Sequence, residues 1–120
     1  MTKFKSEGVF KSFYNAYRGL KLVVFSQRNF VIEFFISLIV VILAFILKFN
    51  TTDFCILLVL ITLVLVLELL NSVIEFTLDA IYKNNYSKLV EMAKDISAGM
   101  VMLASLMSAF IGGLLYLKYL

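Results

Sequence analysis

The sequence has no histidine and no proline, and it has one cysteine, Cys55. Without histidine, general acid–base catalysis would have to use carboxylates, lysine or tyrosine. The lack of histidine and of a second cysteine excludes the HExxH and C-x-x-C patterns of zinc sites. Any metal ion is therefore expected to be a hard one with oxygen ligands, such as Mg²⁺. Cys55 lies in an apolar run and is expected to be a small buried hydrophobe.

Charged residues are also scarce. Asp, Glu, Lys and Arg make up 16% of the chain, whereas about 25% is usual in soluble domains. Hydrophobic residues reach 62%, and the mean hydropathy is +1.01. This composition predicts a single integral-membrane domain over residues 1–120. The basic N-terminal segment lacks the apolar core and cleavage site of a secretory signal peptide.

Residues 8–25 are expected to form an amphipathic helix. Basic side chains cover much of one side, and the other side carries a stripe of large apolar side chains at helical spacing: Phe10, Phe13, Tyr14, Tyr17, Leu20 and Val24. This pattern is typical of a helix that lies in the membrane interface, with its basic side toward lipid phosphates. The alternative is an ordinary amphipathic helix packed on protein.

Three apolar stretches follow, at about residues 30–47, 54–82 and 96–117. The first has about 18 residues, near the minimum needed to cross about 30 Å of hydrocarbon. The second extends about 42 Å as a helix, so its last turns should stand in water. Asp53 is the expected N-cap of the second helix, and residues 83–91 are polar enough for a loop or a helical hairpin. The predicted fold is an all-α membrane protein with a surface helix and three spans.

The distribution of Lys and Arg predicts the orientation. Six of the eleven basic residues lie between residues 3 and 28, and three more lie in or beside the second connection, residues 83–94. Cytoplasmic loops carry an excess of such residues. The N-terminus and the second connection should therefore be cytosolic, in the cytoplasmic membrane, with the C-terminus outside.

The second apolar stretch ends in the segment ELLNSVIEFTLD, residues 68–79. At about 100° per residue, five polar side chains fall in an arc of roughly 100°: Glu68, Asn71, Ser72, Glu75 and Asp79. Helix length places Glu68 within about 9 Å of the cytosolic boundary of the hydrocarbon, Glu75 near that boundary and Asp79 beyond it.

A carboxylate inside the membrane costs about 2.5–3.5 kcal/mol, and such residues usually have a function. Glu68 is therefore a candidate general base, and Glu75 a candidate ligand for a divalent cation. The alternative is a polar seam that specifies helix packing. Lys94 and Asp95 begin the third stretch on the same side. Lys94 could bind phosphate groups, and Asp95 could contact a nucleotide or cap the helix N-terminus. The simpler interpretation is a lysine that snorkels to the interface beside an aspartate that caps the helix.

The segment ELLNSVIEFTLD, followed by AKDISAG at residues 93–99, resembles the signature of the prokaryotic diacylglycerol kinase and undecaprenol kinase family. The stretches FYNAYRGL and QRNF near the N-terminus are similar to that family as well. The resemblance covers essentially the whole chain. It implies a homotrimer in the membrane, with active sites between protomers at the cytosolic interface, that transfers the γ-phosphoryl group of ATP, with Mg²⁺, to a lipid alcohol. It implies no nucleic-acid partner.

The resemblance also implies roles for individual residues. Glu68 matches the catalytic base and Glu75 a metal ligand. The positions around the nucleotide match Asn71, Asp79, Tyr86, Lys94 and Asp95. Gln27 stands where the family has a second metal-binding glutamate, so its amide would coordinate without adding charge.

Two further departures concern Glu33 and the loop before the third span. Glu33 lies six residues after Gln27, about 120° away on a continuous helix, and would replace the missing carboxylate only if the chain bends. Its position matches a carboxylate of the diacylglycerol branch. The loop reads Asn85, Tyr86, Ser87 where the family often has E-Y-H.

The stretches AKDISAGMVML and QRNF are more similar to the undecaprenol branch than to the diacylglycerol branch, which leaves diacylglycerol as the alternative substrate. Two other interpretations stay open. One is an impaired kinase homologue, and the other is a non-enzymatic protein, such as a small pore or an assembly factor.

Overall fold

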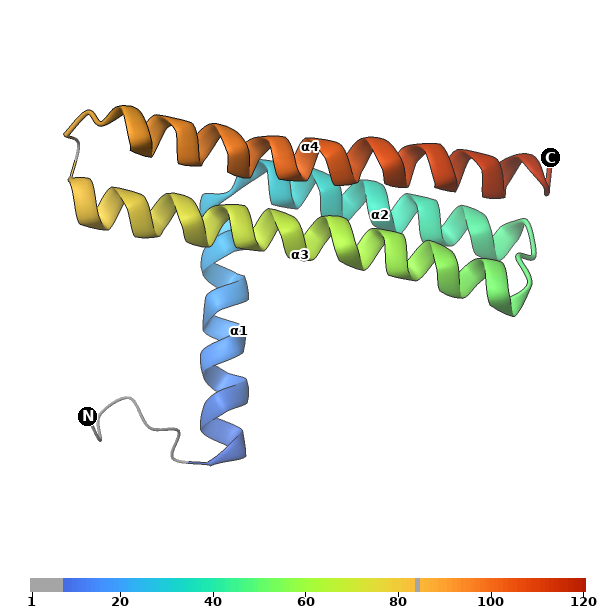
Figure 1. Ribbon diagram of the computed structural model, residues 1–120. Helices are drawn as coiled ribbons and strands as arrows, with labels where there is room; N and C mark the ends of the chain where they lie inside the picture. Colours follow the sequence, from blue (N-terminus) through green and yellow to red (C-terminus); the bar gives the residue numbers. More distant parts are fainter. Residues whose placement is uncertain (1–7, 84) are drawn as a thin grey trace.

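The computed structural model describes residues 8–83 and 85–120. They form four α-helices and no strand in these two ranges: α1 Val9–Ser26, α2 Arg28–Ile46, α3 Thr51–Tyr82 and α4 Lys88–Leu117. The helices α2, α3 and α4 lie side by side, with α3 antiparallel to the other two (Figure 1). The first helix projects away from the bundle at the start of α2. The predicted all-α class, with one additional helix before three long ones, is confirmed.

The three bundle helices are long and apolar enough to cross a membrane. They contain 19, 32 and 30 residues, and each includes a strongly hydrophobic window. At 1.5 Å per residue, α3 is about 48 Å long, which exceeds the roughly 30 Å of a hydrocarbon core. One or both of its ends must therefore extend into the interface or water. The apolar side chains that the bundle exposes suit contact with lipid, because lipid tails take the place of a protein core.

The ends of α3 and α4 differ from the expected ones. Asn50, and not Asp53, caps α3: its Oδ1 accepts a hydrogen bond of 2.8 Å from the backbone N–H of Asp53. The prediction that Asp53 is the cap is wrong, because α3 begins three residues earlier. The helix α4 begins at Lys88, eight residues before the predicted span, so Asp95 lies two turns inside it and does not cap it.

Tertiary contacts at the C-terminal end hold α3 against the end of α4. The side chain of Asp53 is only 6% exposed and accepts hydrogen bonds from Lys118 Nζ at 2.9 Å and from Tyr119 OH at 2.6 Å. The Tyr119 ring stacks on Phe49, with 4.2 Å between ring centroids. We call these four residues the outer-end clasp. Cys55, one turn away, is exposed, so the expectation that it is buried is wrong.

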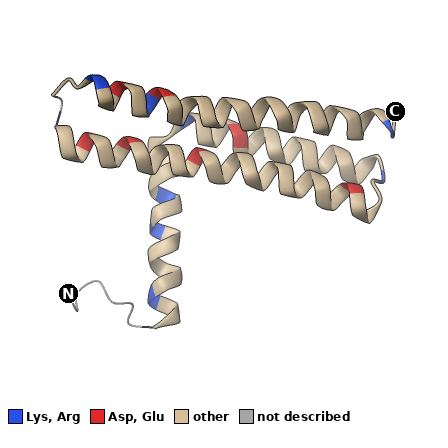
Figure 2. Ribbon diagram, viewed as in Figure 1, with Lys and Arg blue, Asp and Glu red and all other residues tan. Residues whose placement is uncertain are grey.

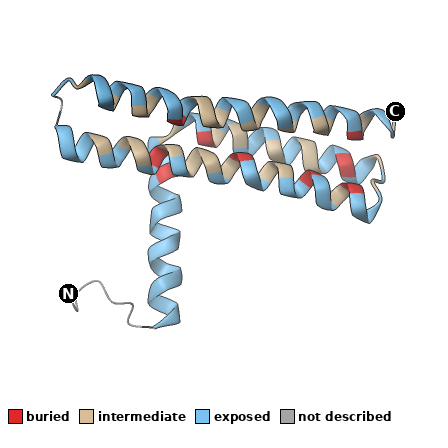
Figure 3. Ribbon diagram, in the orientation of Figure 1, coloured by how far each residue is buried: buried red, intermediate tan, exposed pale blue. Residues whose placement is uncertain are grey.

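The helix α1 has little contact with the bundle (Figure 3). Val23, near its end, is its only buried residue in the described range. Phe10 and Phe13 are 92% and 72% exposed. Arg18 lies over the Tyr14 ring, 5.9 Å from its centroid. Because the aromatic side is covered by no other described part of the chain, the fold favours a membrane-surface helix over a helix packed on protein.

Candidate active site

The polar stripe of α3 faces α4. Ser97 Oγ donates a 2.5 Å hydrogen bond to Asn71 Oδ1. One or two turns further along, Lys94 Nζ forms an ion pair with Asp79 Oδ1 at 2.7 Å. Two residues of the predicted arc, Asn71 and Asp79, therefore contact α4. We call this row of contacts between the two helices the α3–α4 seam.

The seam changes from buried to exposed along its length. Ser97 is buried, whereas the side chains of Lys94 and Asp79 are 37% and 63% exposed. Figure 2 shows charged residues gathered on α3 and α4 at the end where they meet, beyond the point where α1 leaves the bundle. If α1 lies in the interface, as its pattern indicates, this end stands in water. The ion pair is then accessible to a soluble, charged ligand.

Glu68 is half-buried on α3, about one turn before Asn71 and further from the exposed end of the seam. The carboxylates of Glu33, on α2, and of Glu75, on α3, lie close enough to act on it electrostatically. Glu75 also acts on the ammonium group of Lys94. The neighbouring Ser72 is buried, and its hydroxyl donates to the backbone oxygen of Glu68 at 3.1 Å. The structure thus gathers three acids and one lysine between α2, α3 and α4.

Two predicted nucleotide residues lie apart from this group. The Tyr86 ring is exposed in the turn before α4, and its hydroxyl donates to Glu91 Oε2 at 3.2 Å. Lys88 binds the other oxygen of the same carboxylate at 3.2 Å. Asp95 is exposed on α4, next to Lys94 in sequence. Both residues lie toward the end where α3 and α4 meet, but no described contact joins them to Glu68 or Asn71.

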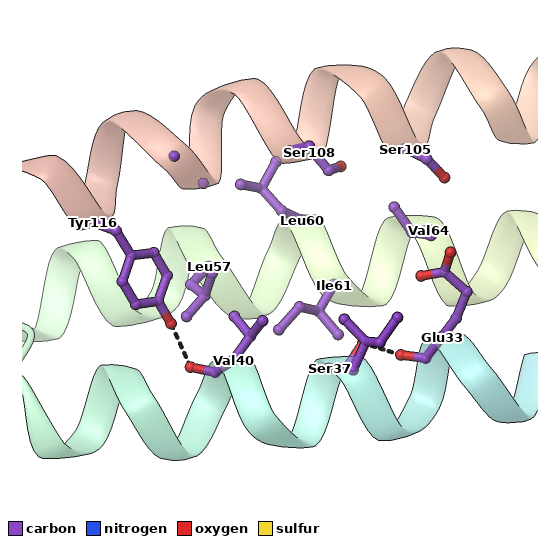
Figure 4. A pocket seen from close by; sticks show the side chains of 14 residues that line it. Glu33, Ser37, Val40, Leu57, Leu60, Ile61, Val64, Ser105, Ser108 and Tyr116 are labelled. Carbon is purple, nitrogen blue, oxygen red and sulfur yellow. Dashed lines mark hydrogen bonds between the residues drawn. The ribbon is translucent and has the colours of Figure 1, made fainter.

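The chain bends at Gln27, which separates α1 from α2. Its backbone is extended, with φ −117° and ψ 97°, and its N–H donates to the Val23 carbonyl oxygen at 2.7 Å. The angle of 120° between Gln27 and Glu33 assumed a continuous helix, so it does not apply. Glu33 instead turns toward α3 from within the bundle (Figure 4). The positions of Glu33 and Ser97 beside the stripe could not be predicted from the sequence, because both residues lie on other helices.

The described residues of one chain hold no group of three acidic, histidine or cysteine side chains arranged to bind a metal ion. This does not conflict with Mg²⁺ chemistry. The ion is usually held by one or two carboxylates together with substrate phosphates and water. Glu75, beside Lys94, supplies a carboxylate of this kind, so the donor set fits a cation that arrives with a nucleotide.

Fold and site together describe a small helical protein whose three long helices can span a membrane, with acidic side chains and a lysine near the end where α3 and α4 meet. The chain is similar over residues 14–116 to the prokaryotic diacylglycerol kinase family. It is 35% identical to a diacylglycerol kinase of Synechocystis sp. over 106 residues, 88% of this chain and 61% of that protein. It is also 35% identical to an undecaprenol kinase of Bacillus subtilis over 108 residues, 90% of this chain and 87% of that protein.

The chain therefore belongs to the prokaryotic diacylglycerol kinase family. This membership confirms the resemblance drawn from ELLNSVIEFTLD and AKDISAG. Both relatives bear the names of lipid kinases. The match spans about three fifths of the length of the Synechocystis relative.

Proposed function

We propose that this protein transfers the γ-phosphoryl group of ATP to the hydroxyl group of undecaprenol, giving undecaprenyl phosphate and ADP. The observation that carries the proposal is the order of groups along the α3–α4 seam. Glu68 is half-buried, and the Asp79–Lys94 ion pair is exposed about 16 Å further along the helix. A lipid alcohol approaching from the membrane and a nucleotide approaching from water would meet along such a seam.

Glu68 acts as the general base in this proposal. It accepts the hydroxyl proton while the lipid oxygen bonds to the γ-phosphorus and the bond to the bridging oxygen of ADP breaks. Phosphoryl transfer depends mostly on positioning and on neutralising charge. Lys94 supplies a positive charge for the phosphates, and its 2.7 Å ion pair with Asp79 is the contact that a bound phosphate would replace.

The remaining site residues serve the metal ion and the nucleotide. Glu75 would hold Mg²⁺ together with phosphate oxygens, with the amide oxygen of Gln27 as a neutral second ligand. The bound ion neutralises phosphate charge in reactions of this type. Asn71, held by Ser97, and the exposed Tyr86 and Asp95 would contact the nucleotide.

The choice of lipid rests on sequence. The segment AKDISAGMVML resembles the undecaprenol branch, and the chain covers 87% of the undecaprenol kinase relative against 61% of the diacylglycerol kinase relative. Diacylglycerol, which would give phosphatidic acid, is the second candidate, because it also presents one hydroxyl group at the interface.

The proposed assembly is a single-domain homotrimer in the cytoplasmic membrane, with sites shared between protomers. The family resemblance supports it, as does a stripe of small residues on α4 that favours close helix contact in lipid: Ser97, Ala104, Ser108 and Gly112. The basic N-terminal segment supports a cytosolic N-terminus and active site.

The test is transfer of labelled phosphate from Mg·ATP to undecaprenol and to diacylglycerol, measured side by side in mixed micelles. We expect faster labelling of undecaprenol. Faster labelling of diacylglycerol would reverse the order of the two substrates. Labelling of neither lipid by an intact protein would contradict the proposed activity, and an ATP-independent ion leak in liposomes would then favour a pore.

A further inference from the structure

Ser97 forms a hydrogen bond that differs from those of three other helical serines. The hydroxyl groups of Ser26, Ser37 and Ser72 each donate to the carbonyl oxygen four residues earlier in the same helix. Such a bond is common for a serine inside a helix. Ser97 instead donates from α4 to Oδ1 of Asn71 on α3, at 2.5 Å. Its hydroxyl group therefore fixes a side chain on the neighbouring helix.

Burial makes this contact persistent. Ser97 is 3% exposed, so water has almost no access to its hydroxyl group. Asn71 is half-buried. A buried hydroxyl group that loses its partner carries a desolvation penalty, and buried polar groups are for this reason nearly always hydrogen-bonded. The Oδ1 end of the Asn71 amide is therefore held toward α4.

The two ends of an asparagine amide have different chemistry. The oxygen accepts hydrogen bonds and can bind a hard metal ion, whereas the NH₂ group can only donate. In a site for Mg²⁺ and ATP, an asparagine can therefore serve as a metal ligand through its oxygen or as a phosphate ligand through its nitrogen. The torsion that turns the amide is broad and roughly two-fold, so the backbone alone does not select one end. Ser97 selects it by binding Oδ1. Because both atoms are bonded to the same planar carbon, Nδ2 points away from Ser97.

The charges near Asn71 agree with this orientation. Glu68 and Glu75 lie about one turn before and one turn after it on α3. Ionised carboxylates accept hydrogen bonds and donate none, so an NH₂ group is a more favourable neighbour for them than a second oxygen. On α4, Lys94 precedes Ser97 by one turn and adds a cation. Within the described residues, the side chain of Asn71 is hydrogen-bonded to Ser97 alone, so its N–H groups remain available to a ligand.

We infer that Ser97 is a positioning residue: it turns the amide of Asn71 so that the NH₂ group binds a phosphate oxygen of the nucleotide and the amide oxygen does not bind Mg²⁺. The inference rests on the proposed function and deepens it. It places the phosphate between the Asn71 amide on α3 and the Lys94 ammonium group on α4. Ser97 itself touches neither the nucleotide nor the metal ion and acts through Asn71.

The first test compares Ser97→Thr with Ser97→Val in the full-length protein in lipid nanodiscs. The two substituted side chains have nearly the same size and shape, but only threonine keeps the hydroxyl group. The measurement is the affinity for a non-hydrolysable imidodiphosphate analogue of ATP at saturating Mg²⁺. Ser97→Val should weaken binding about two- to tenfold, as expected when one neutral hydrogen bond is lost. Ser97→Thr should bind the analogue as the wild-type protein does.

The second test is Asn71→Asp, which leaves Ser97 in place. One carboxylate oxygen can still accept the hydrogen bond from Ser97, but the other stands where the NH₂ group was. Beside a phosphate, this change should weaken binding of the analogue roughly 10–100-fold, and more than Asn71→Ala does. If the amide oxygen of Asn71 were instead a ligand of Mg²⁺, the added charge would lower the Mg²⁺ concentration needed for half-maximal binding.

The outcomes separate this inference from the proposed function. Equal affinities of Ser97→Thr and Ser97→Val, or a lower Mg²⁺ requirement in Asn71→Asp, would overturn the inference alone. Because binding needs no turnover, a wild-type protein that binds the analogue but phosphorylates neither lipid would contradict the proposed function alone. A wild-type protein that binds no nucleotide would overturn both. If Ser97→Val failed to fold, Asn71→Asp compared with Asn71→Ala would still decide which end of the amide meets the phosphate.

Discussion

The two ends of the bundle each join α3 to α4 through an aspartate and a lysine, but the two pairs differ in exposure. In the outer-end clasp, the Asp53 side chain is 6% exposed and is bound by both Lys118 and Tyr119. In the α3–α4 seam, Asp79 is 63% exposed, and Lys94 is its partner at 2.7 Å. The contrast lies in the two carboxylates, because Asp53 is covered and Asp79 is exposed, while both lysines are partly exposed, Lys118 at 58% and Lys94 at 37%. The same pair of residue types thus suits stability at one end and ligand exchange at the other.

The surroundings of Lys118 agree with a structural role. The hydrogen bond to Asp53 and the negative charge of that residue raise the pKa of Lys118 above its usual value. Lys118 therefore stays protonated around neutral pH, and its ion pair with Asp53 persists there. Exposed ion pairs in water are weak, so Lys94 can leave Asp79 for a phosphate at little cost.

The largest expected effect is that of Glu68→Gln, compared with Asp53→Asn at the other end. Loss of a general base typically lowers turnover by about 10²–10⁴-fold. We expect Glu68→Gln to lower kcat within that range with an unchanged Tm. Asp53→Asn should lower Tm and leave kcat near that of the wild-type protein. Full activity in Glu68→Gln would remove Glu68 from the role of base.

The two lysines give the second comparison. Lys94→Met should lower kcat by about 10²-fold, as expected when a charge-stabilising group is lost, and should raise the KM for ATP. Lys118→Met leaves the Asp53 carboxylate without its cation, so Tm should fall while the KM for ATP stays constant. Activity assays and thermal unfolding in the same detergent would measure both. If Lys94→Met and Lys118→Met lost activity to a similar extent, the assignment of Lys94 to the active site and of Lys118 to stability would be wrong.

A smaller effect is expected from Gln27→Glu. A carboxylate binds Mg²⁺ more strongly than a neutral amide does, because it adds charge. The Mg²⁺ concentration that gives half-maximal rate should therefore fall a few-fold, and Gln27→Ala should not lower it. An unchanged Mg²⁺ dependence in Gln27→Glu would show that the corner between α1 and α2 does not contact the ion.

The smallest effect is expected from Ser97→Ala, which removes the hydrogen bond to Asn71. A neutral hydrogen bond contributes about 0.5–1.5 kcal/mol, which corresponds to a factor of roughly 2–10 in kcat/KM. Ser105→Ala, on the same helix but away from Asn71, should leave kcat/KM unchanged. Equal effects of the two substitutions would indicate that Ser97 acts only through packing.

Local patterns in the sequence predicted much of this arrangement, because helical periodicity is a local property. The arc of Glu68, Asn71 and Asp79 follows from spacing alone, and in the structure Asn71 and Asp79 contact α4. The contacts of Ser97 and Glu33 could not be predicted, since they depend on how separate helices pack.

Two local features were also missed. The bend at Gln27 involves neither glycine nor proline at that residue, so no residue type marks it. Asn50 and Asp53 are both good capping residues, and only the structure shows that Asn50 is the one that caps α3.

The central claim is that the end where α3 and α4 meet is the catalytic end. Photolabelling with an azido derivative of ATP, in the presence of Mg²⁺, tests it most directly. We predict that labelled peptides fall within residues 71–95, that unlabelled ATP competes for them, and that Lys94→Met labels less than Lys118→Met. Competed labelling at residues 48–53 or 118–120, with none at the α3–α4 seam, would contradict the account.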